Sequence, residues 1–196
     1  MKCNEPPILV SLRNLQTAIP EKLNVAIQGF QCDRDNELAD FLKDRAALFE
    51  QKGKSRTYLL LDHEMLRCGD ASIIAFFSVA PQVMFVPPSL SVRQIRRLDG
   101  FSGKMRGKKI EALPVYLLGQ FAKNDACADR MTGHELILYA WKIIKQAQSL
   151  IGGRIVMADV KTAAEGLIRF YEGENFQLVS QSEETGLSQL IYMLDD

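Results

Sequence analysis

The order of secondary-structure patterns between Val115 and Phe176 constrains the fold of this chain more than any other feature. Hydrophobic runs and polar breaks alternate there as strand, loop, helix, strand and helix, over residues 115–122, 123–131, 132–150, 154–160 and 162–172. Strand patterns that alternate with helix patterns are typical of α/β proteins. The second helix pattern closes on Phe170-Tyr171-Glu172, which places a tyrosine near the end of that helix.

The helix predicted from Thr132 to about Leu150 has the clearest pattern in the chain. Its apolar residues recur at three- and four-residue steps, as they do on a helix with one buried face. This stripe consists of Leu136, Ala140, Ile143 and Ala147. Gly152-Gly153 is expected to end the helix, because glycine readily adopts the left-handed backbone that follows a helix C-terminus.

Weaker patterns precede this region. β-type runs at 57–61 and 71–79 predict two strands, and the segment Asp62–Asp70 between them has the length of a hairpin connection. Asp35 is a candidate capping residue for a helix that follows it. Residues 80–111 show no clear period, so we expect a long connection there, and connections of that length are usually functional or disordered.

Composition narrows the class of protein. The 196 residues are 47% hydrophobic and 24% charged, which predicts a single soluble globular domain over residues 1–196. No apolar run is long enough to span a membrane, and the N-terminus lacks the apolar core of a signal peptide, so we expect a cytoplasmic protein. The four cysteines and two histidines form no cluster with ligand spacing, so we expect free thiols and no metal site.

Charge is unevenly distributed along the chain. Net charge is zero, but one segment holds seven basic residues against Asp99 alone. The seven residues of this basic cluster are Arg93, Arg96, Arg97, Lys104, Arg106, Lys108 and Lys109. It is either a solvated basic loop or a contact surface for an RNA backbone, whose phosphates release counterions when basic side chains neutralise them.

The segment 166–176 carries a family resemblance. Its Phe170-Tyr171-Glu172, followed by Asn175-Phe176, resembles the Ala-x-x-Phe-Tyr-Glu-x-x-Gly-Phe motif of the GNAT N-acetyltransferases. Asn175 stands where the family has glycine, and asparagine is the next-best residue for a left-handed backbone. This motif and the element order together resemble most the compact acetyltransferases that act as toxins in bacterial toxin–antitoxin pairs. The resemblance covers roughly residues 28–180.

The resemblance implies an α/β GNAT fold with a mixed, mostly antiparallel central sheet flanked by helices, whose strands are splayed at an acyl-CoA cleft. It also implies that the loop before the predicted long helix binds the coenzyme A pyrophosphate through its amides. Glycines of the family loop let the backbone approach a phosphate closely. Here the loop reads Ala128-Asp129-Arg130-Met131-Thr132-Gly133, and only Gly133 matches the family pattern. The implied cofactor-binding residues are Phe121, Ala122, Arg130, Met131, Thr132 and Gly133, the first two lining the thioester.

For Tyr171 the resemblance implies a catalytic role, in which its phenol protonates the departing coenzyme A thiolate. A phenol suits this task because it keeps its proton at neutral pH and can donate it as charge develops. The alternative is that Tyr171 is a half-buried aromatic without chemistry. Glu111 and Glu165 are both candidate bases for a substrate amine, and the sequence does not choose between them.

The expected function is therefore transfer of an acetyl group from acetyl-CoA to a primary amine by direct attack. The acceptor is the amine of an aminoacyl-tRNA, a protein or a small metabolite, and in the first case Arg93, Arg96, Arg97, Lys104 and Arg106 would bind it. An antitoxin protein is an implied partner, and a homodimer is one possible state. The alternative is a non-catalytic GNAT-fold binding or regulatory module with a degenerate cofactor loop.

Overall fold

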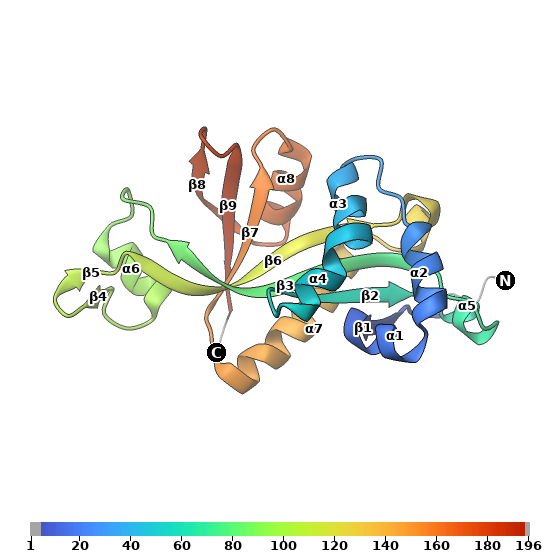
Figure 1. Cartoon of the computed structure of the whole chain (residues 1–196). Coiled ribbons are helices and arrows are strands. Elements are labelled where there is room, and N and C mark those ends of the chain that lie inside the picture. Colours follow the sequence, from blue (N-terminus) through green and yellow to red (C-terminus); the bar gives the residue numbers. More distant parts are fainter. Residues whose placement is uncertain (1–4, 195–196) are drawn as a thin grey trace. The chain divides into compact units, whose positions relative to one another are not determined.

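The structure is a computed structural model that describes residues 5–194 (Figure 1). It contains two compact units, each described by itself below. The first consists of the described residues through Ala80 together with Gly119–Lys142, and the second of Pro81–Leu118 together with the described residues from Ile143 onward. Strands β3 (Ile73–Phe85) and β6 (Ala112–Lys123) and helix α7 (Gly133–Ile151) contribute residues to both units.

The central sheet is mixed and mostly antiparallel, as the resemblance implied, and its seven strands have the order β1-β2-β3-β6-β7-β9-β8. The remaining strands are β1 (Ile8–Ser11), β2 (Arg56–Leu61), β7 (Ile155–Lys161), β8 (Gln177–Ser182) and β9 (Leu187–Met193). Neighbouring strands are antiparallel for β1–β2, β2–β3, β7–β9 and β8–β9. The β6–β7 pair is parallel and joins Tyr116 to Val156 and Leu117 to Met157. A parallel pair needs a crossover, and here α7 provides it.

The first unit packs short helices on its strands. They are α1 (Leu12–Ala18), α2 (Pro20–Gln28), α3 (Asn36–Asp40), α4 (Ala46–Gln51) and α5 (His63–Arg67), with a π-helical turn at Phe41–Arg45. Pro20 occupies the first turn of α2, where its missing N–H costs nothing. The core includes Phe30 edge-to-face against Phe76, with ring centroids 5.2 Å apart. Such pairs add to the stabilisation from apolar burial alone.

A buried carboxylate connects α4 to β2 within this unit. Glu50 is 2% exposed and accepts hydrogen bonds from the backbone N–H of Thr57 (2.7 Å) and from Arg56 Nη1 (2.9 Å). Charged groups are buried only where such partners replace water. Glu50 therefore fixes the end of α4 to the start of β2.

The second unit contains the C-terminal strands, α8 (Glu165–Gly173) and the segment that the sequence left without a pattern. That segment forms α6 (Val92–Asp99) and a two-stranded hairpin of β4 (Lys104–Met105) and β5 (Lys108–Lys109). Ser91 and Gln94 form a capping box at the start of α6, and Gly100 ends it with φ 78°. The expectation of a connection without regular structure over residues 80–111 is thus wrong, because the capping box of Ser91 and Gln94 and the buried pair Ile95 and Leu98 define a short amphipathic helix there.

Several other sequence predictions have clear outcomes. The predicted long helix is confirmed as α7, and Gly152 follows it with φ 72°. Asn175 has φ 66°, as expected for the residue that replaces glycine in the motif. The connection Asp62–Asp70 is not a plain hairpin turn, because it contains α5, whose cap is Asp62. Cys32, Cys68 and Cys127 are free thiols, as expected, while Cys3 lies outside the described residues.

We expect Glu50→Ala to destabilise the protein by about 2–4 kcal/mol, because it leaves the buried Thr57 N–H without an acceptor and Arg56 without its partner. Urea unfolding at equilibrium would measure the change. Asp44→Ala, an exposed carboxylate on the adjoining helical turn, is the matched control and should change the free energy of unfolding by less than about 0.5 kcal/mol. Equal effects of the two variants would show that the buried hydrogen bonds of Glu50 are not what stabilises this junction.

Candidate functional site

The start of α7 is closed by a reciprocal capping box. Thr132 donates its backbone N–H to the Glu135 carboxylate (2.6 Å), and Glu135 donates its own N–H to the Thr132 hydroxyl oxygen (3.1 Å). Bonds from the backbone and the hydroxyl of Thr132 lower the pKa of the Glu135 carboxyl. The open amide expected at Thr132 is therefore wrong for this structure. Within residues 5–194, no acceptor is bonded to the N–H of Gly133, which lies in the first turn.

The loop before α7 is a 3-10 turn, η2 (Asp125–Arg130), held by its own side chains and neighbours. Asn124 caps this turn by accepting from Ala126 N–H (3.2 Å). Lys123 donates its ammonium to the carbonyl oxygen of Met131 (2.8 Å). A cation thus offsets the negative end of the Met131 carbonyl just before the helix, and among the described residues the N–H of Gly133 is the first-turn donor for which no acceptor is found.

Arg130, a predicted phosphate ligand, is committed to a neighbour in the same unit. Its Nη1 lies 3.0 Å from one oxygen of Asp62, whose side chain is only 8% exposed. The other oxygen of Asp62 accepts the backbone N–H groups of Glu64 (2.9 Å) and Met65 (3.2 Å) and so caps α5. One buried carboxylate therefore links α5 to the loop that leads into α7. Arg130 would have to leave Asp62, or share it, to bind an anion.

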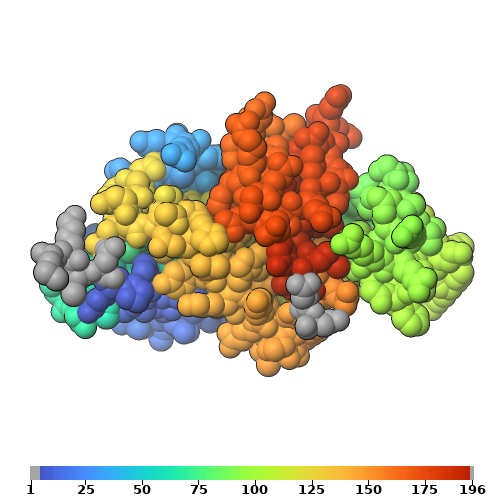
Figure 2. Space-filling view, turned by 180° about the vertical axis from the view of Figure 1, so that it is seen from behind, coloured from blue at the N-terminus to red at the C-terminus, as the bar shows by residue number. Residues whose placement is uncertain are grey.

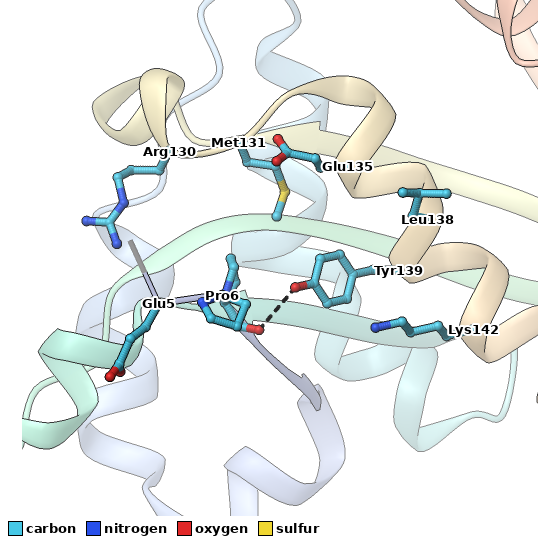
Figure 3. A pocket seen from close by; sticks show the side chains of 9 residues that line it. Glu5, Pro6, Arg130, Met131, Glu135, Leu138, Tyr139 and Lys142 are labelled. Atoms are coloured by element: carbon cyan, nitrogen blue, oxygen red, sulfur yellow. Dashed lines mark hydrogen bonds between the residues drawn. The ribbon is translucent and has the colours of Figure 1, made fainter. Parts of the chain in front are cut away.

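A pocket of about 370 Å³ lies beside the first turns of α7, lined by residues of the N-terminal segment and of α7 (Figure 3). Tyr139 donates its hydroxyl to the carbonyl oxygen of Pro7 (3.4 Å), and the Lys142 ammonium lies 4.7 Å from the Tyr139 ring centroid. Arg130 points away from Met131 and Glu135 in this view. Figure 2 shows the face on which the N-terminal strand, in blue, borders the start of α7, in yellow. The pocket carries both signs of charge.

Phe121 and Ala122, the predicted thioester contacts, follow an irregular part of β6. The Ser78 hydroxyl accepts the backbone N–H of Gln120 (2.9 Å), so a side chain takes the place of a ladder partner. A Cβ at Gly119 would lie 2.7 Å from the Ser78 hydroxyl oxygen, so a larger residue there would displace the hydroxyl that accepts from Gln120. Ala122 is buried and belongs to the core of the first unit. The roles of Phe121 and Ala122 stay predictions.

Tyr171, the predicted general acid, lies in the second unit near the end of α8. It is 3% exposed, and its ring centroid lies 5.0 Å from that of Phe176 and 5.3 Å from that of Phe170. Burial raises the pKa of its phenol far above the ordinary value. The phenol therefore keeps its proton at neutral pH, which a general acid requires. Its predicted access to a coenzyme A sulfur stays a prediction.

The basic cluster is presented by α6 and the β4–β5 hairpin. All its members are exposed except Lys109, which donates to the carbonyl oxygen of Pro88 (3.2 Å). In the described part of the chain, no carboxylate pairs with Arg93, Arg96 or Arg97. Ile95 and Leu98 are buried beneath them. The helix thus presents an unpaired basic face, held in place by an apolar one.

Other kinds of site find little support. Between residues 5 and 194, no three His, Cys, Asp or Glu side chains gather as metal ligands would. None of the helices described here is both long and apolar enough to cross a membrane.

Comparison with solved structures shows which known proteins share this fold. A tyrosine-to-phenylalanine variant of KacT is 15% identical with a TM-score of 0.69, and the alignment covers 96% of this chain and 95% of that one. The AtaTR complex with acetyl-CoA is 16% identical with a TM-score of 0.68, and the alignment covers 96% of this chain and 94% of that one. AtaT complexed with acetyl-methionyl-tRNAfMet is 15% identical with a TM-score of 0.64, and the alignment covers 85% of this chain and 86% of that one. No protein-family model matches the sequence.

The chain has the fold of the GNAT acetyltransferase toxins. Because these alignments span most of both chains, the GNAT fold covers both units. In this fold β6, η2 and α7 form the segment that the sequence associated with the cofactor. The splay of strands that the resemblance implied stays a prediction.

The Asp62–Arg130 pair should act as one unit that holds the loop before α7. We expect Asp62→Asn and Arg130→Gln each to lower the free energy of unfolding by about 1 kcal/mol, and the double variant to cost little more than either. Asparagine keeps an acceptor for the cap of α5, so Asp62→Asn removes the charge and leaves the cap.

Arg67→Gln is the matched control, since Arg67 is also an arginine beside α5 and pairs with Glu5 (3.1 Å) but is 64% exposed. Arg67→Gln should change the free energy of unfolding by close to zero, because an exposed ion pair contributes little. Chemical denaturation of the unmodified chain, the two single variants and the double variant would complete the double-mutant cycle, and Arg67→Gln would be measured beside them. Strictly additive losses for Asp62→Asn and Arg130→Gln would show that the two residues do not act together.

Proposed function

We propose that this protein is an N-acetyltransferase that moves the acetyl group of acetyl-CoA to a primary amine. The observation that carries the proposal is the GNAT fold, shared with structures that hold acetyl-CoA, in a chain that keeps Tyr171 with its Phe-Tyr-Glu motif. Transfer proceeds by direct attack of the amine on the thioester carbonyl. All of the chain, 1–196, forms the acetyltransferase domain.

The start of α7 offers a partial fit to the pyrophosphate of coenzyme A. The N–H of Gly133 lies in the first turn, where unpaired donors and the helix dipole favour an anion. The Glu135 carboxylate already occupies the Thr132 N–H and would repel a phosphate nearby. We infer that Met131, Thr132 and Gly133 bind mainly through the backbone, and that Arg130 contributes only when it leaves Asp62. Phe121 and Ala122 line the thioester.

Tyr171 is the proposed general acid. Two similar proteins, KacT and AtaT, were solved as tyrosine-to-phenylalanine variants, which supports a special role for one tyrosine in these proteins. When bound, acetyl-CoA supplies an activated acetyl group. The chain itself must orient it, keep water away and return a proton to the sulfur. A buried phenol that stays protonated can do the last of these.

The proposed acceptor is the amine of an aminoacyl-tRNA. AtaT is found with acetyl-methionyl-tRNAfMet, and the basic cluster gives this chain an exposed surface for a phosphate backbone. Such an acceptor would place the protein in the cytoplasm. AtaT also binds the C-terminus of the antitoxin AtaR, and KacT is found in a KacTA–DNA complex, so an antitoxin is the proposed protein partner.

The second candidate is a non-catalytic GNAT-fold module that binds a partner or ligand. The internal capping of Thr132 and the commitment of Arg130 favour it, because both reduce the groups available to a phosphate. Titration of acetyl-CoA by calorimetry separates the two functions. Micromolar binding supports the enzyme, and no heat at millimolar acetyl-CoA supports the module.

We expect Tyr171→Phe to lower kcat for acetyl transfer by roughly 10²-fold or more, the usual effect of losing a proton-transfer group. Binding of acetyl-CoA should change little, because the substitution removes one oxygen from an aromatic cluster. Single-turnover assays with the purified chain would measure the rate. Phe170→Leu, which alters the same cluster without removing a hydroxyl, is the control for packing. An unchanged kcat would exclude Tyr171 from the chemistry.

For the acceptor, we expect Arg93→Glu, Arg96→Glu and Arg97→Glu together to abolish transfer to aminoacyl-tRNA while acetyl-CoA affinity is retained. Transfer by the unmodified chain should fall steeply with salt, with a log–log slope of about −0.7 to −0.9 for each phosphate that its basic side chains neutralise. A triple lysine variant at the same positions keeps the charge and is the control. Salt-independent transfer to a small amine by the charge-reversed protein would reject the RNA acceptor.

A further inference from the structure

The turn that follows α6 displays a phenylalanine to solvent. Phe101 is 82% exposed, the largest exposed fraction among the large hydrophobic residues that the structure describes. It lies between Gly100, which ends α6 with φ 78°, and the β4–β5 hairpin. An exposed ring gains none of the free energy that burial would provide. The packing of the second unit therefore does not explain why an aromatic residue stands here.

Hydrogen bonds hold the backbone on both sides of Phe101. The Asp99 carboxylate accepts the backbone N–H groups of Ser102 (3.0 Å) and Gly103 (3.1 Å). The Ser102 hydroxyl donates to the carbonyl oxygen of Lys104 (2.6 Å) and accepts the N–H of the same residue (3.1 Å). The turn is thus held in place while the ring stays exposed. A contact made by the ring would therefore cost little additional ordering of the chain.

The same turn lies directly on α6. Gly103 is buried, and a Cβ there would lie 2.8 Å from the backbone nitrogen of Arg96. Figure 1 shows α6 and the β4–β5 hairpin beside each other. Phe101 stands within the basic cluster along the chain, with Arg97 four residues before it and Lys104 three residues after it. The exposed ring and the basic side chains therefore belong to one surface.

The charge of this surface is almost entirely positive. Asp99 is the only acidic residue between Pro81 and Ile110, and its carboxylate is engaged by the two N–H groups of the turn. Attraction to a polyanion therefore acts where the ring is displayed. Aromatic rings among basic side chains are the means by which proteins bind unpaired nucleic acid, because the cations contact phosphates while bases stack on the rings.

We propose that Phe101 is a stacking platform for an unpaired base of the RNA that the basic cluster contacts. This inference rests on the proposed function, in which the acceptor is an aminoacyl-tRNA. Bases inside a duplex are already stacked on their neighbours, whereas bases in loops, bulges and 3′ ends can be splayed onto an aromatic ring. A tRNA has unpaired bases in its loops and at its 3′ end. The ring thus selects unpaired RNA, while the basic side chains attract any phosphate backbone.

Other occupants fit this surface less well. The cores of protein–protein interfaces are depleted of lysine, whereas Lys104 and Lys108 are exposed in the hairpin that follows Phe101. A second copy of this chain would bring the same basic face against itself, which repulsion between like charges opposes. A membrane surface favours a broad apolar face. Among the described residues of the turn and hairpin, Met105, which is 67% exposed, is the one large apolar side chain besides Phe101 that is exposed.

The test measures binding of the full chain to a labelled single-stranded RNA, and to the same strand annealed to its complement, by fluorescence anisotropy. We expect Phe101→Leu to weaken single-strand binding roughly 10- to 100-fold, because stacking of one base is lost. Duplex binding should change by less than about twofold, because paired bases do not reach the ring. The slope of affinity against salt should stay that of the unmodified chain, since no charge is removed. Phe101→Trp should retain the affinity, and the single strand should quench its added indole fluorescence.

Two variants are matched controls. Phe85→Leu removes another exposed ring (78%) of the same unit, and it should leave RNA affinity unchanged. Its neighbour Met84 is buried in a cluster with Ile95 of α6, so the alternation of the strand directs Phe85 away from α6. Arg96→Gln keeps the ring and removes a charge, so it should weaken binding of both RNA forms and reduce the salt slope by about 0.7 to 0.9. Because both rings are exposed, Phe101→Leu and Phe85→Leu should unfold at the temperature of the unmodified chain.

The outcomes separate this inference from the function beneath it. If Phe101→Leu binds the single strand as tightly as the unmodified chain, or loses equal affinity for single strand and duplex, Phe101 is not a stacking platform, although the basic cluster keeps its RNA role. Equal losses for Phe85→Leu would also overturn the inference. Loss of binding to vesicles of phosphatidylserine and phosphatidylcholine without loss of RNA binding would assign the ring to a membrane. If the unmodified chain binds no RNA, the RNA acceptor and the stacking fail together, while acetylation of a small amine by the same protein would still support the acetyltransferase.

Discussion

The alternation of side chains along β7 is the constraint on which the organisation of the second unit depends. With a period of two, the strand must present Met157 and Asp159 to one side and Val156 and Ala158 to the other. Helix α6 packs on the first side through Ile95 and Leu98. The aromatic cluster of α8 packs on the second. A shift of one residue in the β7–β9 register would exchange these sets, and the apolar burial on both sides prevents it.

In the first unit, the comparable constraint is how the start of α7 satisfies its own backbone. Every helix leaves unpaired N–H groups in its first turn. Here the capping box takes two of them, and Lys123 and Asp62 hold the loop that precedes it. These bonds hold the loop in place without any glycine at the position of Met131. The glycine-poor sequence is therefore compatible with an ordered loop, while it reduces the groups that an incoming phosphate would find.

Local features were predictable from the sequence, and long-range ones were not. The apolar stripe of α7 and the left-handed Asn175 follow from helix periodicity and from backbone preferences of single residues. Short α6 was missed, although Ser91 and Gln94, three residues apart, are a recognisable capping box before it. The pairing of Arg130 with Asp62 joins residues far apart in sequence, so no local pattern reveals it.

The placement of charge bears on the choice between an enzyme and a binding module. Arg130 and the Thr132 N–H are already paired within the first unit, which reduces what a phosphate would find at the start of α7. In the second unit, Arg93, Arg96 and Arg97 are exposed on α6, above the buried Ile95 and Leu98. A basic face held in place by an apolar one suits contact with a polyanion under either function, because attraction to phosphates depends on exposed charge and not on acetyl transfer.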